Sequence, residues 1–163
     1  MTFTPISNNL RPMKLKLIGL LLGLPLVGAE PSGYKYWSAA ELKAMSKPLS
    51  NKADAKTSSE NLGNFGADHV LMVHREGSGV AELHDLEADV IVVTSGSGTL
   101  IVGGTMPGSK NTAPGEERAP AVEGGASQKI GPGDIIHIPA NTPHQVTLEP
   151  GKQITYFTLK VKE

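Results

Sequence analysis

The sequence contains no cysteine among its 163 residues. Disulfide bonds, a catalytic thiolate and zinc sites built on cysteine are therefore excluded. Aromatic residues are also scarce, at 4% of the chain. So few aromatic side chains argue against the stacking platforms with which proteins bind single-stranded nucleic acid, and against aromatic-lined sugar clefts. These absences narrow the candidate functions before any motif is considered.

Neither sign of charge is in excess, because 15 lysine and arginine residues are balanced by 16 aspartate and glutamate residues. This balance gives no indication of nucleic acid or of an anionic membrane surface as a partner. The length is sufficient for one domain with a hydrophobic core. We therefore expect a single domain that binds neither nucleic acid nor a membrane.

Long hydrophobic runs are missing as well, and the most apolar segment is residues 17–27, "LIGLLLGLPLV". About 20 apolar residues are needed to span a bilayer, so this segment is too short to do so. It is typical of the apolar part of a secretory signal peptide, and the basic residues Arg11, Lys14 and Lys16 precede it as such a signal requires.

We expect residues 1–29 to form this signal peptide, with cleavage after Ala29 because small or short residues precede the cut. Met13, directly before Lys14, is an alternative start of translation. The mature protein is then expected to be periplasmic or secreted, with no membrane contact after cleavage. The competing interpretation is a buried apolar helix, which Pro25 disfavours.

The next segment, residues 30–66, is expected to form a helix followed by an arm. Ser38 and Glu41 have the spacing of a capping box, which predicts a short helix over residues 39–46 that ends before Pro48. Residues 51–64 are polar and predict an irregular arm on the surface. A domain of residues 67–163 follows.

This domain is predicted to be all-β. Short segments rich in β-branched residues are separated by turns that contain glycine or proline, and no helical pattern lies between them. Such a series indicates a sandwich or a closed barrel. One connection, residues 103–128, is long, polar and rich in glycine and proline, so we interpret it as a lid or a disordered loop. The expected strands are residues 69–74, 80–84, 90–94, 99–102, 135–138, 145–148 and 154–161.

A specific motif lies in residues 131–146, "GPGDIIHIPANTPHQV". Gly133 and Asp134 make a turn into a strand, Pro139 ends that strand, and the short "ANTP" hairpin returns the chain so that His144 begins the next strand. The segment resembles the second motif of the cupin superfamily, in which P-G-D, a short strand, I-P and four further residues precede a metal-binding histidine.

The first cupin motif then lies upstream, in and after "ELHDLEAD". The family pattern is H-x-H, three or four residues, E, six residues and G. Counting back from Gly96 places Asp89 at the acidic position, His84 at the second histidine and Glu82 at the first. The spacing fits throughout, but glutamate replaces one histidine and aspartate replaces the glutamate.

The resemblance implies a cupin-type double-stranded β-helix, or jelly-roll barrel, that holds a divalent metal through Glu82, His84, Asp89 and His144. Imidazole and carboxylate ligands suit Fe, Mn, Ni or Zn. Strand alternation places Glu82 and His84 on one face. Glu82 is alternatively a carboxylate that transfers protons, and Asp89, with its shorter side chain, alternatively binds through water or acts as a general base.

His137 alternates with Ile136 and Ile138 along its strand and is our candidate for a catalytic proton donor or base, with a packing role as the alternative. Gln145 is a weaker candidate for the rim of a pocket. We expect neither His69 nor His74 to bind a metal.

The implied function is a small-molecule enzyme of the dioxygenase, isomerase or lyase type, and the sequence does not decide among them. A non-catalytic binding module and a metal-free structural barrel are the alternatives. A homodimer is expected in each case, because an unpaired sheet edge is a liability.

Overall fold

The computed structural model describes residues 28–50 and 56–163. Residues Lys35–Glu163 form one compact unit, and the fold given below is that of this unit. The expected signal peptide falls almost entirely outside the described residues, so it stays a prediction. Within the described part of the chain, no helix is long and apolar enough to cross a membrane.

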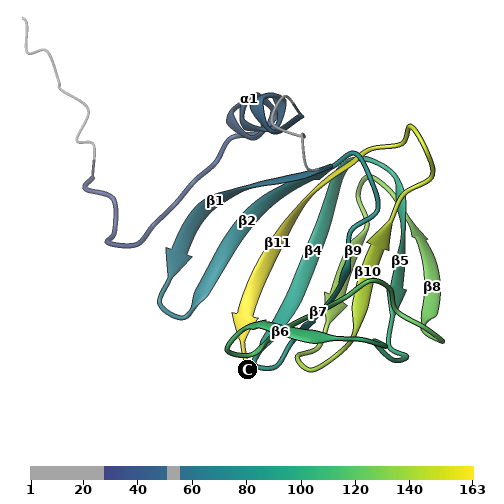
Figure 1. Ribbon diagram of the computed structural model, residues 1–163. Helices are drawn as coiled ribbons and strands as arrows, with labels where there is room; N and C mark the ends of the chain where they lie inside the picture. The colour runs from purple at the N-terminus through teal and green to yellow at the C-terminus, as the bar shows by residue number, and fades with distance from the viewer. Residues whose placement is uncertain (1–27, 51–55) are drawn as a thin grey trace, which may run out of the picture. The chain divides into compact units, whose positions relative to one another are not determined.

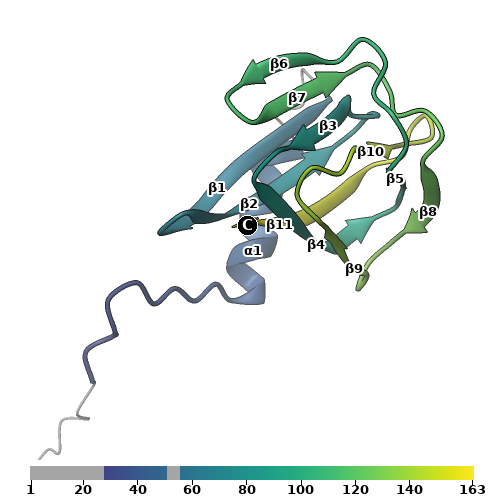
Figure 2. The ribbon, with the colours of Figure 1, turned by 90° about the horizontal axis from the view of Figure 1, so that it is seen from below.

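The described residues contain one helix followed by a series of strands. The strands form two antiparallel sheets that face each other (Figures 1 and 2). The elements are α1 (Ala39–Ser50), β1 (Thr57–Phe65), β2 (Asp68–Arg75), β3 (Ala81–His84), β4 (Glu87–Gly96), β5 (Gly98–Val102), β6 (Lys110–Ala113), β7 (Glu116–Ala119), β8 (Ala126–Ile130), β9 (Ile135–Ile138), β10 (His144–Thr147) and β11 (Ile154–Lys162).

Sheet A has the strand order β1-β2-β11-β4-β9, and sheet B has the order β6-β7-β3-β10-β5-β8. Strands that are neighbours in space are mostly not neighbours in sequence, because the chain crosses repeatedly from one sheet to the other. This is the arrangement of a double-stranded β-helix. The predicted all-β fold is therefore confirmed.

Alternate residues of each strand point into the space between the sheets. On β4 these residues include Ile91 and Val93, and on β10 they include Val146, all of them buried in one apolar cluster. Further along the same strands, the inward-facing residues are charged. They are Asp89 on β4 and Lys160 on β11, and both are buried. The interior is thus divided into an apolar end and a charged end.

Helix α1 begins where the capping box predicts, since the Glu41 amide donates to the Ser38 hydroxyl at 3.2 Å. Its predicted end is wrong, because the helix continues through Pro48 to Ser50. Leu49 in the last turn is buried, with 1% of its surface exposed, and its carbonyl accepts a hydrogen bond from Ser58 on β1 at 2.6 Å. Pro48 has no N–H to donate within the helix, and the contacts of Leu49 hold the last turn in place.

Two stretches predicted to be irregular contain strands instead. β1 lies within the expected arm, and β6, β7 and the start of β8 lie within residues 103–128. β1 and β6 are edge strands of their sheets, and β6 is exposed throughout. Polar residues suit the solvent-facing side of an edge strand, so the polar composition concealed these elements.

Two glycines of the cupin-like motifs have backbone conformations that other residues rarely adopt. Gly96 has a φ of 73°, and a Cβ at this position would lie 2.0 Å from the Gln153 carbonyl oxygen. Gly133 has a φ of 92°, and its N–H donates to the Val93 carbonyl at 2.9 Å. The second turn is thereby attached to β4, the strand that carries Asp89.

Candidate metal centre

Glu82 and His84 lie two positions apart on β3, and His144 begins β10 directly opposite Glu82. One potential ligand atom from each of these residues lies within 4.8 Å of the others. The hairpin before His144 is attached to β3, because the Asn141 N–H donates to the His84 carbonyl at 2.7 Å. The structure therefore brings together three of the four residues predicted to bind a metal.

Both imidazoles are held by a hydrogen bond at Nδ1, an arrangement common in metal-binding histidines. His84 Nδ1 lies 2.8 Å from the Glu116 carboxylate, and His144 Nδ1 lies 2.9 Å from the Thr142 carbonyl. Both partners accept hydrogen bonds, so each Nδ1 carries a hydrogen, and each Nε2 is the ring atom that lies near the carboxylates of the site. Burial and the nearby Lys160 ammonium lower the pKa of His84, which favours its neutral form.

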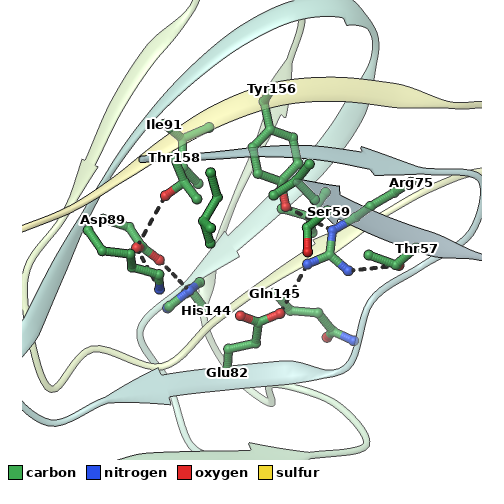
Figure 3. A pocket seen from close by; sticks show the side chains of 14 residues that line it. Thr57, Ser59, Arg75, Glu82, Asp89, Ile91, His144, Gln145, Tyr156 and Thr158 are labelled. Atoms are coloured by element: carbon green, nitrogen blue, oxygen red, sulfur yellow. Dashed lines mark hydrogen bonds and ion pairs between the residues drawn. The ribbon is translucent and has the colours of Figure 1, made fainter. Parts of the chain in front are cut away.

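Asp89 lies beside this group but is bound to other partners as well (Figure 3). Its Oδ2 is 3.1 Å from His144 Nε2, whereas its Oδ1 accepts hydrogen bonds from Lys160 at 2.6 Å and Thr158 at 3.3 Å. Burial alone would raise the pKa of Asp89, but His144 and Lys160 bring it well below its usual range. The carboxylate is therefore ionised at neutral pH.

Glu82 is paired with arginine (Figure 3). Its Oε1 accepts a hydrogen bond from Arg75 at 3.0 Å, and its Oε2 lies 3.9 Å from the Arg118 guanidinium. Burial tends to raise the pKa of Glu82, yet these cations lower it below its ordinary value. Arg75 also donates to the Tyr156 hydroxyl at 2.8 Å and to Thr57 at 3.2 Å, so its guanidinium is fixed.

Strand β7, in the stretch predicted to be a loop, supplies residues that sequence analysis missed. In the β3–β7 register, Glu116 is opposite His84 and Arg118 is opposite Glu82. The two β7 side chains also form an ion pair at 2.8 Å. The polar sequence around Glu116 and Arg118 did not indicate a strand. Without that strand, their pairing with His84 and Glu82 could not be expected from residue spacing.

Lys160 is the other missed residue. It is the cross-strand partner of Asp89, and its Nζ lies 2.5 Å from His84 Nε2. Alternation along β11 places it on the same face as Tyr156 and Thr158, which was the available signal. A lysine near the end of the chain would ordinarily be expected to lie at the surface.

The structure does not support His137 as a catalytic residue. It pairs with Val90 on the outer side of sheet A and is exposed, whereas Ile138 beside it is buried. The alternation that buries one residue turns the other toward solvent. Gln145 lines the cavity, as the sequence suggested. Its amide is held by the protein itself, because it donates to the Gly79 carbonyl at 2.8 Å and accepts from the Val122 N–H at 3.2 Å.

A cavity of about 210 Å³ adjoins the candidate ligands (Figure 3). Its volume suits a small molecule rather than a polymer. Its polar lining includes hydroxyl groups and cations as well as the carboxylates, and its apolar lining belongs to both sheets. The lining residues are Thr57, Ser59, Leu71, Val73, Arg75, Glu82, Asp89, Ile91, His144, Gln145, Val146, Tyr156, Thr158 and Lys160.

The donor set fits a divalent transition metal. Two imidazoles with inward Nε2 atoms and one carboxylate are the kinds of ligand that such ions accept. The hydrogen bonds to Glu116 and Thr142 are the outer contacts that orient metal-binding histidines. One feature opposes an ion, because each nearby carboxylate already has a cationic partner.

No family model and no curated protein matches the sequence. Among solved structures, a conserved protein with a double-stranded β-helix domain from Klebsiella pneumoniae aligns with a TM-score of 0.50 and 13% identity, covering 67% of this chain and 79% of that chain. The chain has the double-stranded β-helix fold. This agrees with the fold expected from its two motifs.

Other solved structures align over a smaller share of their length. A cupin-2 domain protein from Rhodospirillum rubrum has 15% identity and a TM-score of 0.48, over 66% of this chain and 61% of that chain. The polyketide cyclase RemF from Streptomyces resistomycificus has 22% identity and a TM-score of 0.47, over 64% of each chain. The chain thus spans less than two thirds of these proteins, and the likeness concerns the fold alone.

Proposed function

We propose that this cupin binds a divalent transition metal through Glu82, His84 and His144 and acts on a small molecule in the adjoining cavity. The orientation of the imidazoles is the observation that carries this proposal. Each Nδ1 is occupied by an acceptor, so both Nε2 atoms are directed toward the point where the Glu82 carboxylate lies. A packing role would not require both rings to be oriented in this way.

A bound ion would supply Lewis acidity toward an oxygen atom of the substrate. The protein supplies orientation beside Glu82, where Arg75, Thr57 and Tyr156 line the cavity with N–H and O–H groups. These donors suit a carboxylate or another oxygen-rich group. Glu82 lines the cavity as well, so a molecule bound there would lie next to the proposed metal ligand.

A second candidate function is a binding module that works without a metal. The ion pairs support it, because Arg75 neutralises Glu82, Lys160 neutralises Asp89 and Arg118 neutralises Glu116. A site that is balanced by its own residues does not need an ion to compensate buried carboxylates. The cavity and its donors would then hold a small polar ligand without reacting with it.

Metal content distinguishes the two candidates. The protein would be purified without chelators or a nickel column, alongside His84→Ala, His144→Ala and the matched control His137→Ala, which removes an exposed histidine. We expect about one equivalent of one transition metal by mass spectrometry in the parent and the control, and loss of that metal in the other two variants.

Two results would contradict the metal proposal. One is the absence of metal from the parent protein even after reconstitution with Fe, Mn, Ni and Zn salts, which would favour the metal-free module. The other is metal that persists in both His84→Ala and His144→Ala, which would place the ion elsewhere in the molecule.

We further propose that the protein is exported. The pattern of residues 1–29 supports this. The test is the intact mass of protein recovered from the periplasm or medium after expression with its own N-terminus. A chain that begins at Glu30 is expected, and an uncut chain retained in the cytoplasm would contradict export. The expected homodimer is checked on the same material by light scattering.

A further inference from the structure

Lys160 occupies an unusual place for a lysine, in the interior of the barrel. Its side chain is only 8% exposed, and it faces the same space as Tyr156 and Thr158. A buried ammonium is costly unless it is paired. Among the described residues, Asp89 is the carboxylate within ion-pair distance of Lys160, at 2.6 Å.

The backbone fixes this pairing. Lys160 on β11 and Asp89 on β4 are direct partners in an antiparallel register that runs the length of both strands. Their side chains point to the same face, so the register of sheet A brings the stem of the lysine next to Asp89.

The ammonium also engages a candidate ligand atom. Lys160 Nζ lies 2.5 Å from His84 Nε2. Since Glu116 holds the hydrogen of His84 at Nδ1, Nε2 is the acceptor of this hydrogen bond. The lone pair that a metal would use is therefore used by the lysine, and both cannot bind it at once.

Asp89 is affected in the same way. Its Oδ2 lies close to both histidines, 3.6 Å from His84 Nε2 and 3.1 Å from His144 Nε2, which is near enough for it to share an ion with them. Its negative charge, however, is balanced by Lys160. The group of residues whose ligand atoms all lie within 4.8 Å of one another consists of Glu82, His84 and His144.

We propose that Lys160 is a built-in competitor of the metal. An ion enters only by displacing the ammonium from His84, and Asp89 remains paired with Lys160 instead of becoming a fourth protein ligand. The site then binds its ion with restrained affinity and leaves more coordination positions open to substrate. This inference rests on the proposed function and adds to it the residue that limits metal binding.

The test compares Lys160→Met with Lys162→Met. Methionine keeps most of the length of the lysine stem without its charge, and Lys162 is an exposed lysine on the same strand, so the control removes an equal charge from the surface. Zinc binding to chelator-treated protein would be measured by competition with a chromophoric chelator. We expect Lys160→Met to bind zinc about tenfold more tightly or better, because repulsion between the ion and a nearby ammonium is removed.

A second substitution identifies the role of Asp89. In the parent protein, Asp89→Asn should change zinc affinity by less than about threefold, since Asp89 is paired with Lys160. In the Lys160→Met background, the same change should remove most of the gain, because Asp89 is then able to coordinate. Circular dichroism of every variant confirms that the barrel is folded, and Lys160→Leu provides a second neutral replacement.

The outcomes separate this inference from the proposed function. Zinc binding that requires His84 but is unchanged or weaker in folded Lys160→Met and Lys160→Leu would overturn the inference and leave the metal proposal intact. Binding by neither the parent nor the lysine variants would overturn both. Tighter binding in the lysine variants alone, with Lys162→Met unchanged, supports the inference.

Discussion

The two ends of the barrel interior are built from the same strands but from opposite kinds of residue. Along β4, Ile91 and Val93 belong to the apolar cluster, whereas Asp89 belongs to the charged group. Along β11, Ile154 is wholly buried among apolar residues, and Lys160 is buried beside a carboxylate. Apolar burial stabilises the fold at one end, while the charged end is balanced pair by pair and has its side chains available for chemistry.

The largest effect on stability is expected at the apolar end. Ile138→Ala should lower the free energy of unfolding by about 2–5 kcal/mol, because the side chain is 1% exposed and its removal leaves a cavity. Chemical denaturation of the purified variant measures this. Ile135→Ala on the same strand is the matched control, since Ile135 is 73% exposed and should change stability by less than about 0.5 kcal/mol.

At the charged end, the expected cost comes from an unpaired group. Arg75→Met removes the main partner of Glu82, and the carboxylate left behind should lower the free energy of unfolding by about 1–3 kcal/mol. The double variant Arg75→Met, Glu82→Gln should recover much of this loss, because no buried charge is then left unpaired. If the double variant is as unstable as the single one, Arg75 contributes through packing and the contrast between the two ends is weakened.

Tyr156 lies at the boundary between the apolar and the charged end of the interior. Its ring belongs to the apolar cluster, and its hydroxyl accepts a hydrogen bond from Arg75. Tyr156→Phe keeps the ring and removes one hydrogen bond, so we expect a loss of about 0.5–1.5 kcal/mol. Denaturation curves analysed together with those of Arg75→Met should show that the two losses are not additive. Additive losses would mean that the hydroxyl acts independently of the arginine.

The smallest effect on stability is expected at Glu116, which lies outside the apolar cluster and is only partly buried. Glu116→Gln should leave the free energy of unfolding within about 0.5 kcal/mol but weaken metal affinity by about tenfold, because Glu116 orients His84. Competition with a chelator measures the affinity. Glu117→Gln, whose backbone pairs with Leu83 and not with a ligand, should have no such effect, and equal weakening in both variants would contradict an orienting role.

The fold could be predicted largely from local patterns. The Pro132-Gly133-Asp134 turn and the glycine at position 96 have the backbone conformations that their residue types imply. The strands with alternating apolar residues were also recognisable. The edge strands β1 and β6 were not, because a strand that buries little has no apolar alternation to reveal it.

The candidate site was predictable in part for a similar reason. Glu82, His84 and His144 follow the spacing of the cupin motifs, so their proximity could be expected from that resemblance. Lys160, Glu116 and Arg118 reach the site through pairing between strands that are far apart in sequence. Spacing within one segment carries no information about such partners. His137 shows the opposite error, because alternation alone did not say which of the two faces of its strand was the inner one.

The β6–β7 hairpin has a consequence for engineering. It supplies the partners of Glu82 and His84 from a stretch that, judged by composition, looks dispensable. Trimming residues 103–128 to make a more compact barrel would keep every motif residue and still alter the electrostatic surroundings of the histidines. Conversely, grafting this hairpin onto another barrel of the same fold offers a way to adjust its metal preference without changing any ligand.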